Sequence, residues 1–207
     1  MVDVYETARG GRLTRVAGRL AARARARRHA QFGRALDLRE SDRILDVGCG
    51  RGGLAAMDRV HDITGLDLRA QEGYAGGRLV VGDAREMPFA DDEFDVVWCN
   101  SLIEHVEPAD RPRVASEIRR VAGRWWVQTP NRWFPVEPHV LLPLFQFLPR
   151  ALRRRLWRFG ASGEPFHDIP LLDRRDLQAL FPESEIRRER VGPLTKSLIA
   201  VGRRGGG

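Results

Sequence analysis

"ILDVGCGRGG", residues 44–53, is the stretch that decides the fold. An apolar run that contains one acid passes directly into a glycine-rich loop, which is typical of a buried strand that ends at a nucleotide. The glycines fit two patterns that bind different ligands. The dinucleotide pattern G-x-G-x-x-G is matched by Gly48, Gly50 and Gly53. A second pattern, D-x-G-x-G-x-G, is matched by Asp46, Gly48, Gly50 and Gly52. The stretch therefore predicts a nucleotide site, and the rest of the chain has to decide which nucleotide.

The composition is that of one globular domain. The chain has 207 residues, of which 43% are hydrophobic and 30% charged, enough for one domain with a sizeable core. The net charge of +7 invites a nucleic-acid partner, yet Lys196 is the only lysine among 35 basic residues. Because nucleic-acid surfaces usually combine lysine and arginine, we interpret the arginine excess as a compositional bias and favour no nucleic acid as partner.

Two cysteines, Cys49 and Cys99, are too few for a disulfide framework or a zinc site, so we expect no metal. No apolar run approaches the length of a membrane span, and the N-terminus lacks the apolar core of a signal peptide. We therefore predict a cytoplasmic protein.

From residue 43 onward, short apolar runs alternate with helical or loop segments. Five runs are apolar on both faces, as parallel strands between helix layers are. They span 43–47, 62–67, 78–82, 94–99 and 124–129. A helix is expected over 108–122, opened by Pro108 and closed near Gly123. The stretch between the second and third strands is short and glycine-rich, so any helix there must be very short.

Two more helices and a hairpin complete the pattern. Residues 12–36 predict an arginine-rich amphipathic helix, and residues 173–181 predict a helix with Asp173 as its N-cap. Strands 185–191 and 196–202 are separated only by the residues GPLT. Because parallel neighbours need a long crossover, these two strands must be antiparallel.

These elements predict a Rossmann-like α/β fold with a seven-stranded mixed sheet, an antiparallel last strand and helices on both faces. We divide the chain into a basic helical cover (1–39), a main domain (40–204) and a disordered tail (205–207). Residues 130–170, rich in proline, aromatic residues and arginine, break the alternation after the fifth strand. We expect this insertion to form a cap over the site.

Three acids address the choice of nucleotide. Asp67 ends the second strand, where an acid can accept hydrogen bonds from ribose hydroxyls. Asp46 beside the glycine loop would repel a pyrophosphate, but it suits the ammonium and sulfonium groups of S-adenosylmethionine. Asp83 follows the third strand, where a carboxylate can accept from the adenine amine. The acids and the terminal hairpin favour S-adenosylmethionine over a dinucleotide.

At this point the sequence resembles a known family, the class I S-adenosylmethionine-dependent methyltransferases of the small-molecule type. The matching stretches are ILDVGCGRGG (44–53), GLDL (65–68), GDAREMPFADDEFDVVWCNSLIEHV (82–106) and KSLIAVG (196–202). The resemblance covers roughly residues 40 to 130, and more weakly the last thirty. A single glycine motif is weak evidence, whereas four motifs in the right order are strong.

The resemblance implies the cofactor residues. Asp46 would lie near the methionine ammonium, and Asp67 would hold the ribose. Asp83 would read the adenine edge. The other residues expected to contact the cofactor are Gly48, Cys49, Gly50, Leu68, Ala84, Asn100 and Ser101. For each acid the alternative is a helix cap or a solvated loop residue. For His105 we favour a structural role over a catalytic one.

Methyl transfer itself needs in-line placement of the acceptor, because the sulfonium is already a good leaving group. A general base matters when the acceptor is a hydroxyl or a similar weak acid. The candidates lie in the insertion and are Glu137, His139, His167 and Asp168. On extended backbone, Glu137 and His139 would point to opposite faces, so we expect one of them to face the cofactor. The alternative is that both brace the insertion.

The predicted function is methylation of a small-molecule or lipid-like acceptor, with O-methylation favoured, by a monomer or homodimer. The alternatives are an RNA methyltransferase and a non-catalytic nucleotide-binding protein of the same fold. Residues 140–149 are almost wholly apolar and are followed by five arginines within 150–158. This segment suits an amphipathic acceptor with an anionic head, or transient contact with an anionic membrane surface. Plain packing of the insertion onto the sheet is the alternative.

Overall fold

The computed structural model describes residues 12–205 except 138, 158–165 and 167, and for residues 12–21 it describes the backbone alone. The described strands form one seven-stranded sheet in the order β3-β2-β1-β4-β5-β7-β6. Its strands are β1 (Arg43–Val47), β2 (Asp62–Asp67), β3 (Arg78–Val81), β4 (Phe94–Asn100), β5 (Ala122–Pro130), β6 (Glu185–Val191) and β7 (Leu194–Arg203). The first five strands run parallel, and β7 is antiparallel to both β5 and β6. The predicted Rossmann-like fold class is confirmed.

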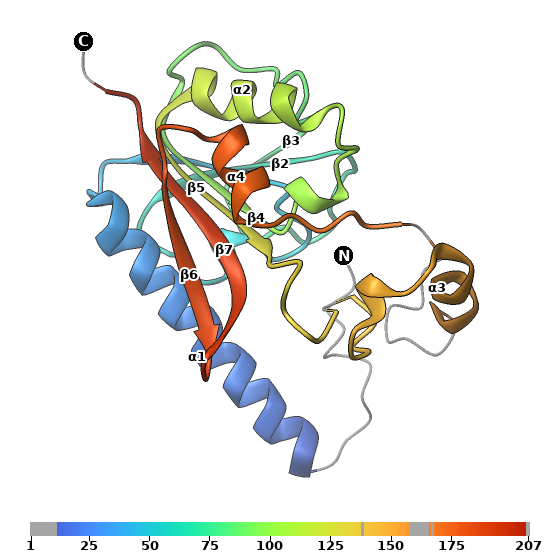
Figure 1. Ribbon diagram of the computed structural model, residues 1–207. Helices are drawn as coiled ribbons and strands as arrows, with labels where there is room; N and C mark the ends of the chain where they lie inside the picture. The colour runs from blue at the N-terminus through green and yellow to red at the C-terminus, as the bar shows by residue number, and fades with distance from the viewer. Residues whose placement is uncertain (1–11, 138, 158–165, 167, 206–207) are drawn as a thin grey trace.

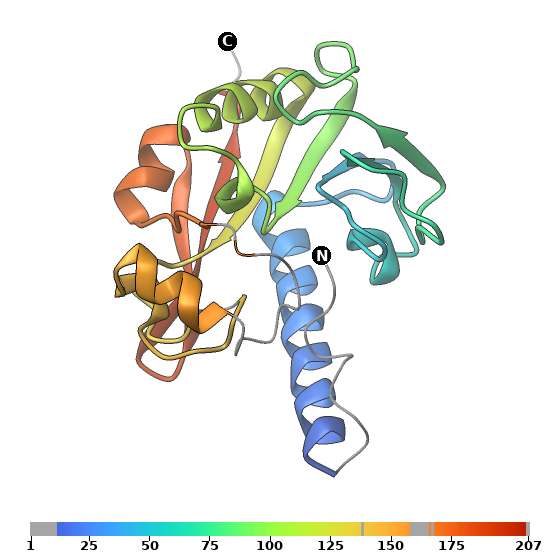
Figure 2. The same ribbon diagram turned by 90° about the vertical axis from the view of Figure 1, so that its right-hand side faces the viewer.

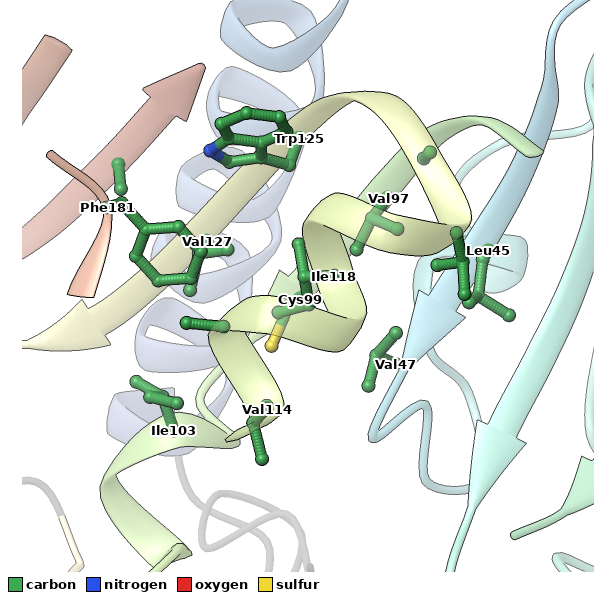
Figure 3. Packing of buried hydrophobic residues seen from close by; sticks show 14 of the residues in the cluster. Leu45, Val47, Val97, Cys99, Ile103, Val114, Ile118, Trp125, Val127 and Phe181 are labelled. Atoms are coloured by element: carbon green, nitrogen blue, oxygen red, sulfur yellow. The ribbon is translucent and has the colours of Figure 1, made fainter. Parts of the chain in front are cut away.

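Helices cover both faces of the sheet (Figure 1), as predicted. Helix α1 (Arg12–Leu36) lies along one face, and α2 (Arg111–Val121) and α4 (Arg174–Leu180) lie on the other. Neighbouring tryptophans of β5 point to opposite faces, as pleating requires. Trp125 packs in the α2 side of the core, which Figure 3 shows, and Trp126 packs in the α1 side.

The α1 layer holds together through aromatic packing and two polar contacts. The Phe32 ring meets the rings of Trp98 and Trp126 edge to face at 4.7 and 5.9 Å. Arg28 pairs with Glu189 on β6 at 3.2 Å, and His29 contacts a buried carboxylate after β1, that of Asp58, at 2.8 Å. The N-terminal half of α1 extends past the sheet in both views (Figures 1 and 2).

Element boundaries differ from the sequence prediction at a few places. Helix α2 begins at Arg111 rather than near Pro108, because Asp110 is the N-cap and Pro112 occupies the first turn. It ends at Val121, since the chain enters β5 at Ala122 and Gly123 belongs to that strand. Residues 68–77, all described, contain no helix between β2 and β3. The prediction for α4 is confirmed, with Asp173 as N-cap.

The insertion after β5 folds around a small apolar cluster of its own. It holds the 3-10 turn η3 (Phe145–Phe147) and helix α3 (Arg150–Leu156). The clustered side chains are Val140, Phe145, Trp157, Ile169 and Leu171. The backbone of Asn131 bridges that of Leu172, so the insertion leaves and rejoins the main domain at one place, beyond the end of β5. Figure 2 shows it there in yellow and orange.

Among the helices that the structure describes, none combines the length and the apolar character needed to cross a membrane.

Candidate functional site

The loop after β1 folds back onto the end of β2. The amides of Gly48 and Cys49 donate to the Leu66 carbonyl at 2.8 and 3.3 Å, and the Gly50 amide donates to Asp67 Oδ2 at 3.0 Å. The glycines with positive φ are Gly48, Gly50 and Gly53, at 73°, 56° and 50°. These conformations favour glycine. The strand ends that the sequence singled out therefore form one continuous surface.

Asp46 lies beneath this loop rather than on its surface. It is 2% exposed, and its Oδ2 accepts a hydrogen bond from the Leu54 amide at 2.6 Å. A Cβ on Gly53 would come within 2.2 Å of that oxygen, so only glycine fits there. Burial, with a smaller contribution from Asp67, raises the Asp46 pKa to about 7. Asp46 thus fixes the loop and the start of the 3-10 turn η1 (Leu54–Ala56); its contact with a ligand ammonium stays a prediction.

The two other acids, Asp67 and Asp83, differ in whether a basic side chain of the protein already binds the carboxylate. Asp67 is half-buried at the end of β2, beside Leu68, which is 67% exposed. Asp83 is held by Arg85, whose guanidinium reaches it at 2.7 Å and also reaches Asp110 at 2.7 Å. Hydrogen bonds from the Arg85 side chain and amide lower the Asp83 pKa. The sequence prediction missed this clamp, so an adenine amine at Asp83 would share the carboxylate with Arg85.

At the end of β4 the structure leaves a buried polar group without a partner. Asn100 Oδ1 is buried and accepts no hydrogen bond from any described residue. Ser101 follows with a φ of 58°, and its amide donates to the Gln128 carbonyl at 2.9 Å. Buried side-chain oxygens are nearly always bonded. Asn100 Oδ1 is therefore a candidate to accept a hydrogen bond from a ligand.

Tyr74 is a neighbour of the loop that no sequence pattern singled out. A Cβ on Gly65 would lie 2.7 Å from Tyr74 Cζ and 2.8 Å from the Cys49 sulfur. The Tyr74 ring and the Cys49 thiol therefore occupy the space beside Gly65. Burial raises the Cys49 pKa to about 12, and it raises the Tyr74 pKa as well. The Cys49 thiol is therefore packed in the interior, and only the backbone of Cys49 lies at the loop surface.

A second polar cluster lies beside the ends of β4 and β5. Glu104, in the 3-10 turn η2 (Ile103–His105), is fully buried, and its Oε2 accepts from the Thr129 hydroxyl at 3.1 Å. Its Oε1 has no hydrogen-bond partner among the described residues. Burial raises the Glu104 pKa to about 7. The rings of His105 and His139 meet edge to face at 4.9 Å.

The insertion brings Glu137 and His139 into direct contact. Glu137 is 4% exposed, and its Oε1 lies 2.6 Å from His139 Nδ1. Its Oε2 accepts from the amides of His139 and Val140, each at 2.8 Å. The expectation that the two side chains point to opposite faces is wrong. The chain turns here, with the Leu141 amide donating to the Glu137 carbonyl at 2.8 Å, so the alternation of an extended strand does not apply.

The remaining catalytic candidates are placed less favourably. His167 lies outside the described residues. Asp168 pairs with the Arg153 guanidinium of α3, so its carboxylate is already neutralised. A cavity of about 840 Å³ opens elsewhere, between α4 and the β6–β7 hairpin, and is lined by Trp133, Arg175 and Arg188 among others. None of the predicted site residues lines it.

Comparison with known proteins places this geometry in context. A family model described as "Methyltransferase domain" matches residues 45–124. The chain is 36% identical over 101 residues to a malonyl-[acyl-carrier protein] O-methyltransferase of Erwinia pyrifoliae, covering 45% of this chain and 36% of that protein. It is 43% identical over 81 residues to a fatty-acid O-methyltransferase of Mycolicibacterium smegmatis, covering 33% and 29%. The chain thus spans about a third of the length of these relatives.

A solved structure extends the likeness over most of the chain. It is the 1,6-didemethyltoxoflavin-N1-methyltransferase of Burkholderia thailandensis, with 1,6-didemethyltoxoflavin and S-adenosylhomocysteine bound. The TM-score is 0.59 at 16% identity, over 87% of this chain and 78% of that one. At this identity the likeness shows the fold.

Proposed function

We propose that the chain is a class I S-adenosylmethionine-dependent methyltransferase, which binds S-adenosylmethionine and transfers its methyl group to an oxygen of a small-molecule acceptor. The observation that carries the proposal is the joined edge of β1 and β2. There Asp67 Oδ2 accepts from the Gly50 amide at 3.0 Å and brings the glycine loop beside the acid that is predicted to bind ribose. Open α/β sheets bind their ligands at the carboxyl ends of their strands.

The cofactor would lie along the ends of β1, β2 and β4. Asp67 accepts from the ribose hydroxyls, and Leu68, with its large exposed side chain, flanks the adenine. Asn100 Oδ1 accepts from the methionine portion, which supplies the donor that this buried atom lacks. Asp46 attracts the ammonium through the loop and is not in direct contact with solvent. This arrangement directs the sulfonium methyl toward the polar cluster beyond β4 and β5.

The acceptor would bind at that cluster, under the insertion. Glu137 accepts three hydrogen bonds and fixes the His139 ring against Glu104 and His105. An acceptor oxygen held by these side chains could meet the methyl group in line, and placement of this kind supplies most of the acceleration. We assign His139 to the polar cluster that receives the acceptor and Glu137 to positioning its imidazole.

The class of acceptor is suggested by the insertion and by the relatives. Exposed apolar side chains gather on the insertion, with Trp133 stacked on Phe147 at 5.7 Å and Leu141, Leu144 and Leu152 also exposed. Two of the relatives are O-methyltransferases named for a fatty acid and for malonyl-[acyl-carrier protein]. These observations support an acceptor that joins an apolar chain to a carboxyl or hydroxyl group.

Calorimetry with S-adenosylhomocysteine and with NAD tests the cofactor assignment. The wild-type chain should bind S-adenosylhomocysteine and not NAD. Asp67→Ala should weaken binding by ~1.5–3 kcal/mol, about 10- to 100-fold, since a hydrogen-bonded charge is lost. Asp62→Ala is the matched control, because Asp62 is exposed at the opposite end of the same strand. Binding of NAD alone, or equal losses in both variants, would overturn the assignment.

Transfer of labelled methyl groups tests the acceptor class. Small-molecule, lipid and RNA fractions of a lysate should be incubated with the protein and labelled S-adenosylmethionine. Label in the small-molecule or lipid fraction supports the proposal, and label confined to RNA contradicts it. His139→Ala and Glu137→Ala should lower turnover while leaving S-adenosylhomocysteine affinity nearly unchanged.

A further inference from the structure

The buried carboxylate of Glu104 is the least compensated charged group near the proposed acceptor site. Thr129 satisfies one oxygen, and the other has no partner among the described residues. The nearby Arg111 guanidinium does not reach it, because Arg111 donates to the main-chain carbonyls of Glu104, Val106 and Pro170. A buried, unpaired carboxylate is costly unless a cation or a donor compensates it.

Two imidazoles converge on this carboxylate. Glu104, His105 and His139 each present one ligand atom, and these atoms all lie within 4.8 Å of one another. Tetrahedral coordination with bonds of ~2.1 Å sets ligand atoms about 3.4 Å apart. Metal binding would therefore need a small adjustment of the three side chains to bring their ligand atoms to that separation.

The surroundings of His139 resemble those of a metal ligand. Its Nδ1 contacts Glu137 Oε1 at 2.6 Å, which leaves Nε2 to face the cluster. A carboxylate on the outer nitrogen of a metal-bound histidine fixes the ring and raises its basicity. Both Glu137 oxygens are occupied by the His139 ring and by two amides, so Glu137 supports the ring and is not itself a ligand.

We propose that Glu104, His105 and His139 bind a divalent transition-metal cation at the acceptor end of the site. Two imidazoles and one carboxylate suit Zn²⁺, Co²⁺, Mn²⁺ or Fe²⁺ better than Mg²⁺ or Ca²⁺, which prefer all-oxygen ligand sets. Three protein ligands leave coordination positions open, as in catalytic sites. The proposal rests on the proposed function in one respect, that an open position would receive the acceptor oxygen. The sequence predicted no metal because the chain has only two cysteines. That prediction considered only sites with thiolate ligands.

A comparison within the chain shows what distinguishes this cluster. Asp58 also lies between two imidazoles, with His29 Nε2 at 2.8 Å and His61 Nδ1 at 2.7 Å. Its other oxygen accepts from the amides of Val60 and His61. The Asp58 carboxylate is therefore fully bonded, and this group serves as the internal control.

Cobalt titration of the full chain, prepared without a histidine tag and treated with a chelator, tests the proposal. Visible absorption and calorimetry should report one Co²⁺ per chain. His105→Ala, His139→Ala and Glu104→Gln should each weaken Co²⁺ binding at least tenfold, and His61→Ala should leave it unchanged. S-adenosylhomocysteine binding, measured without metal on the same samples, shows that each variant is folded and tests the proposed function separately.

The outcomes separate the two proposals. Failure of the wild-type chain to bind Co²⁺ while it binds S-adenosylhomocysteine would overturn the metal site alone. Co²⁺ binding that survives both His105→Ala and His139→Ala would also overturn it. Co²⁺ binding that depends on these residues in a chain that does not bind S-adenosylhomocysteine would support the metal site and contradict the proposed function.

Discussion

At the scale of single residues, buried acids carry most of the chemistry. Asp46 lies near the end of β1 and Glu104 lies in η2, beyond the end of the neighbouring strand β4, and burial raises the pKa of each to about 7. Asp46 accepts a hydrogen bond from the loop backbone, whereas one oxygen of Glu104 has no hydrogen-bond partner in the part of the chain that the structure describes. Two acids in similarly buried positions therefore differ in role: Asp46 fixes a loop, and Glu104 is proposed to present a ligand atom.

Replacing Asp46 by asparagine should change how stability depends on pH. The folded-state pKa of about 7 lies above the ordinary aspartate pKa of 3.8, so the stability contributed by the protonated acid is present below about pH 4 and lost as the pH rises through 7. The loss is at most about 1.4 kcal/mol per pH unit in that window. Asp46→Asn keeps an acceptor for the Leu54 amide and lacks this titration.

Urea unfolding at pH 5 and pH 8 measures the effect. Asp46→Asn should gain stability relative to wild type on going from pH 5 to pH 8, while Asp62→Asn, which changes an exposed acid at the start of β2, should not. The same Asp46 variant should bind S-adenosylhomocysteine more weakly, because the negative charge near the ammonium is gone. A stability difference that is the same at both pH values would contradict the assignment.

At the scale of elements, helix ends follow local hydrogen bonding more closely than apolar pattern. Helix α4 has only seven residues, and Asp173 caps it by accepting from the amides of Arg175 and Asp176. The Asp176 carboxylate in turn accepts a hydrogen bond from the Asp173 amide at 2.9 Å, which completes a capping box. The cap matters because α4 packs Leu177 into the main core and links the insertion to β6.

Removal of this cap should destabilise the fold without touching the site. Asp173→Ala should lower the free energy of unfolding by ~1 kcal/mol, measured by urea denaturation. Arg174→Ala changes an exposed neighbour and should have a much smaller effect. S-adenosylhomocysteine affinity should be equal in wild type and both variants, and a marked loss of affinity in Asp173→Ala would show that α4 contributes to the site.

At the scale of the whole molecule, the positive charge is concentrated on the insertion and α1. Arg150, Arg154 and Arg155 of α3 are exposed, next to the exposed apolar side chains of the insertion. Arg153 differs from them, because it pairs with Asp168. An apolar surface edged by arginines suits contact with anionic lipid, and such contact would bring a lipid-like acceptor to the proposed site.

Sedimentation with vesicles tests this contact. The wild-type chain should bind anionic vesicles at low salt, bind them less at moderate salt, and not bind neutral vesicles. Reversal of Arg150, Arg154 and Arg155 to Glu should reduce binding. Reversal of Arg39, Arg59 and Arg78 makes the same change in net charge on other exposed positions and should reduce it less. Absence of binding at low salt would leave a protein that meets its acceptor in solution.

The sequence by itself determined the sheet, because strands buried on both faces leave apolar runs that local reading detects. It also placed the acids and glycines at the strand ends, because the strand boundaries and the direction of the chain are enough to locate a residue at the end of a strand. Helix α2 begins later than predicted, at Arg111, because the residues before it close a turn of their own, in which the Asp110 amide donates to the Glu107 carbonyl at 2.9 Å.

Only the tertiary structure decided the polar cluster beyond β4 and β5. Its members come from η2 and from a turn of the insertion, more than thirty positions apart in the sequence, and no periodic pattern connects them. The turn at Glu137 overrode the alternation expected of extended backbone. The Arg85 clamp on Asp83 and the Tyr74 ring beside Gly65 likewise depend on which side chains fill the space around them. Burial, which leaves one Glu104 oxygen without a partner among the described residues, is a property of the packed chain and not of the residue.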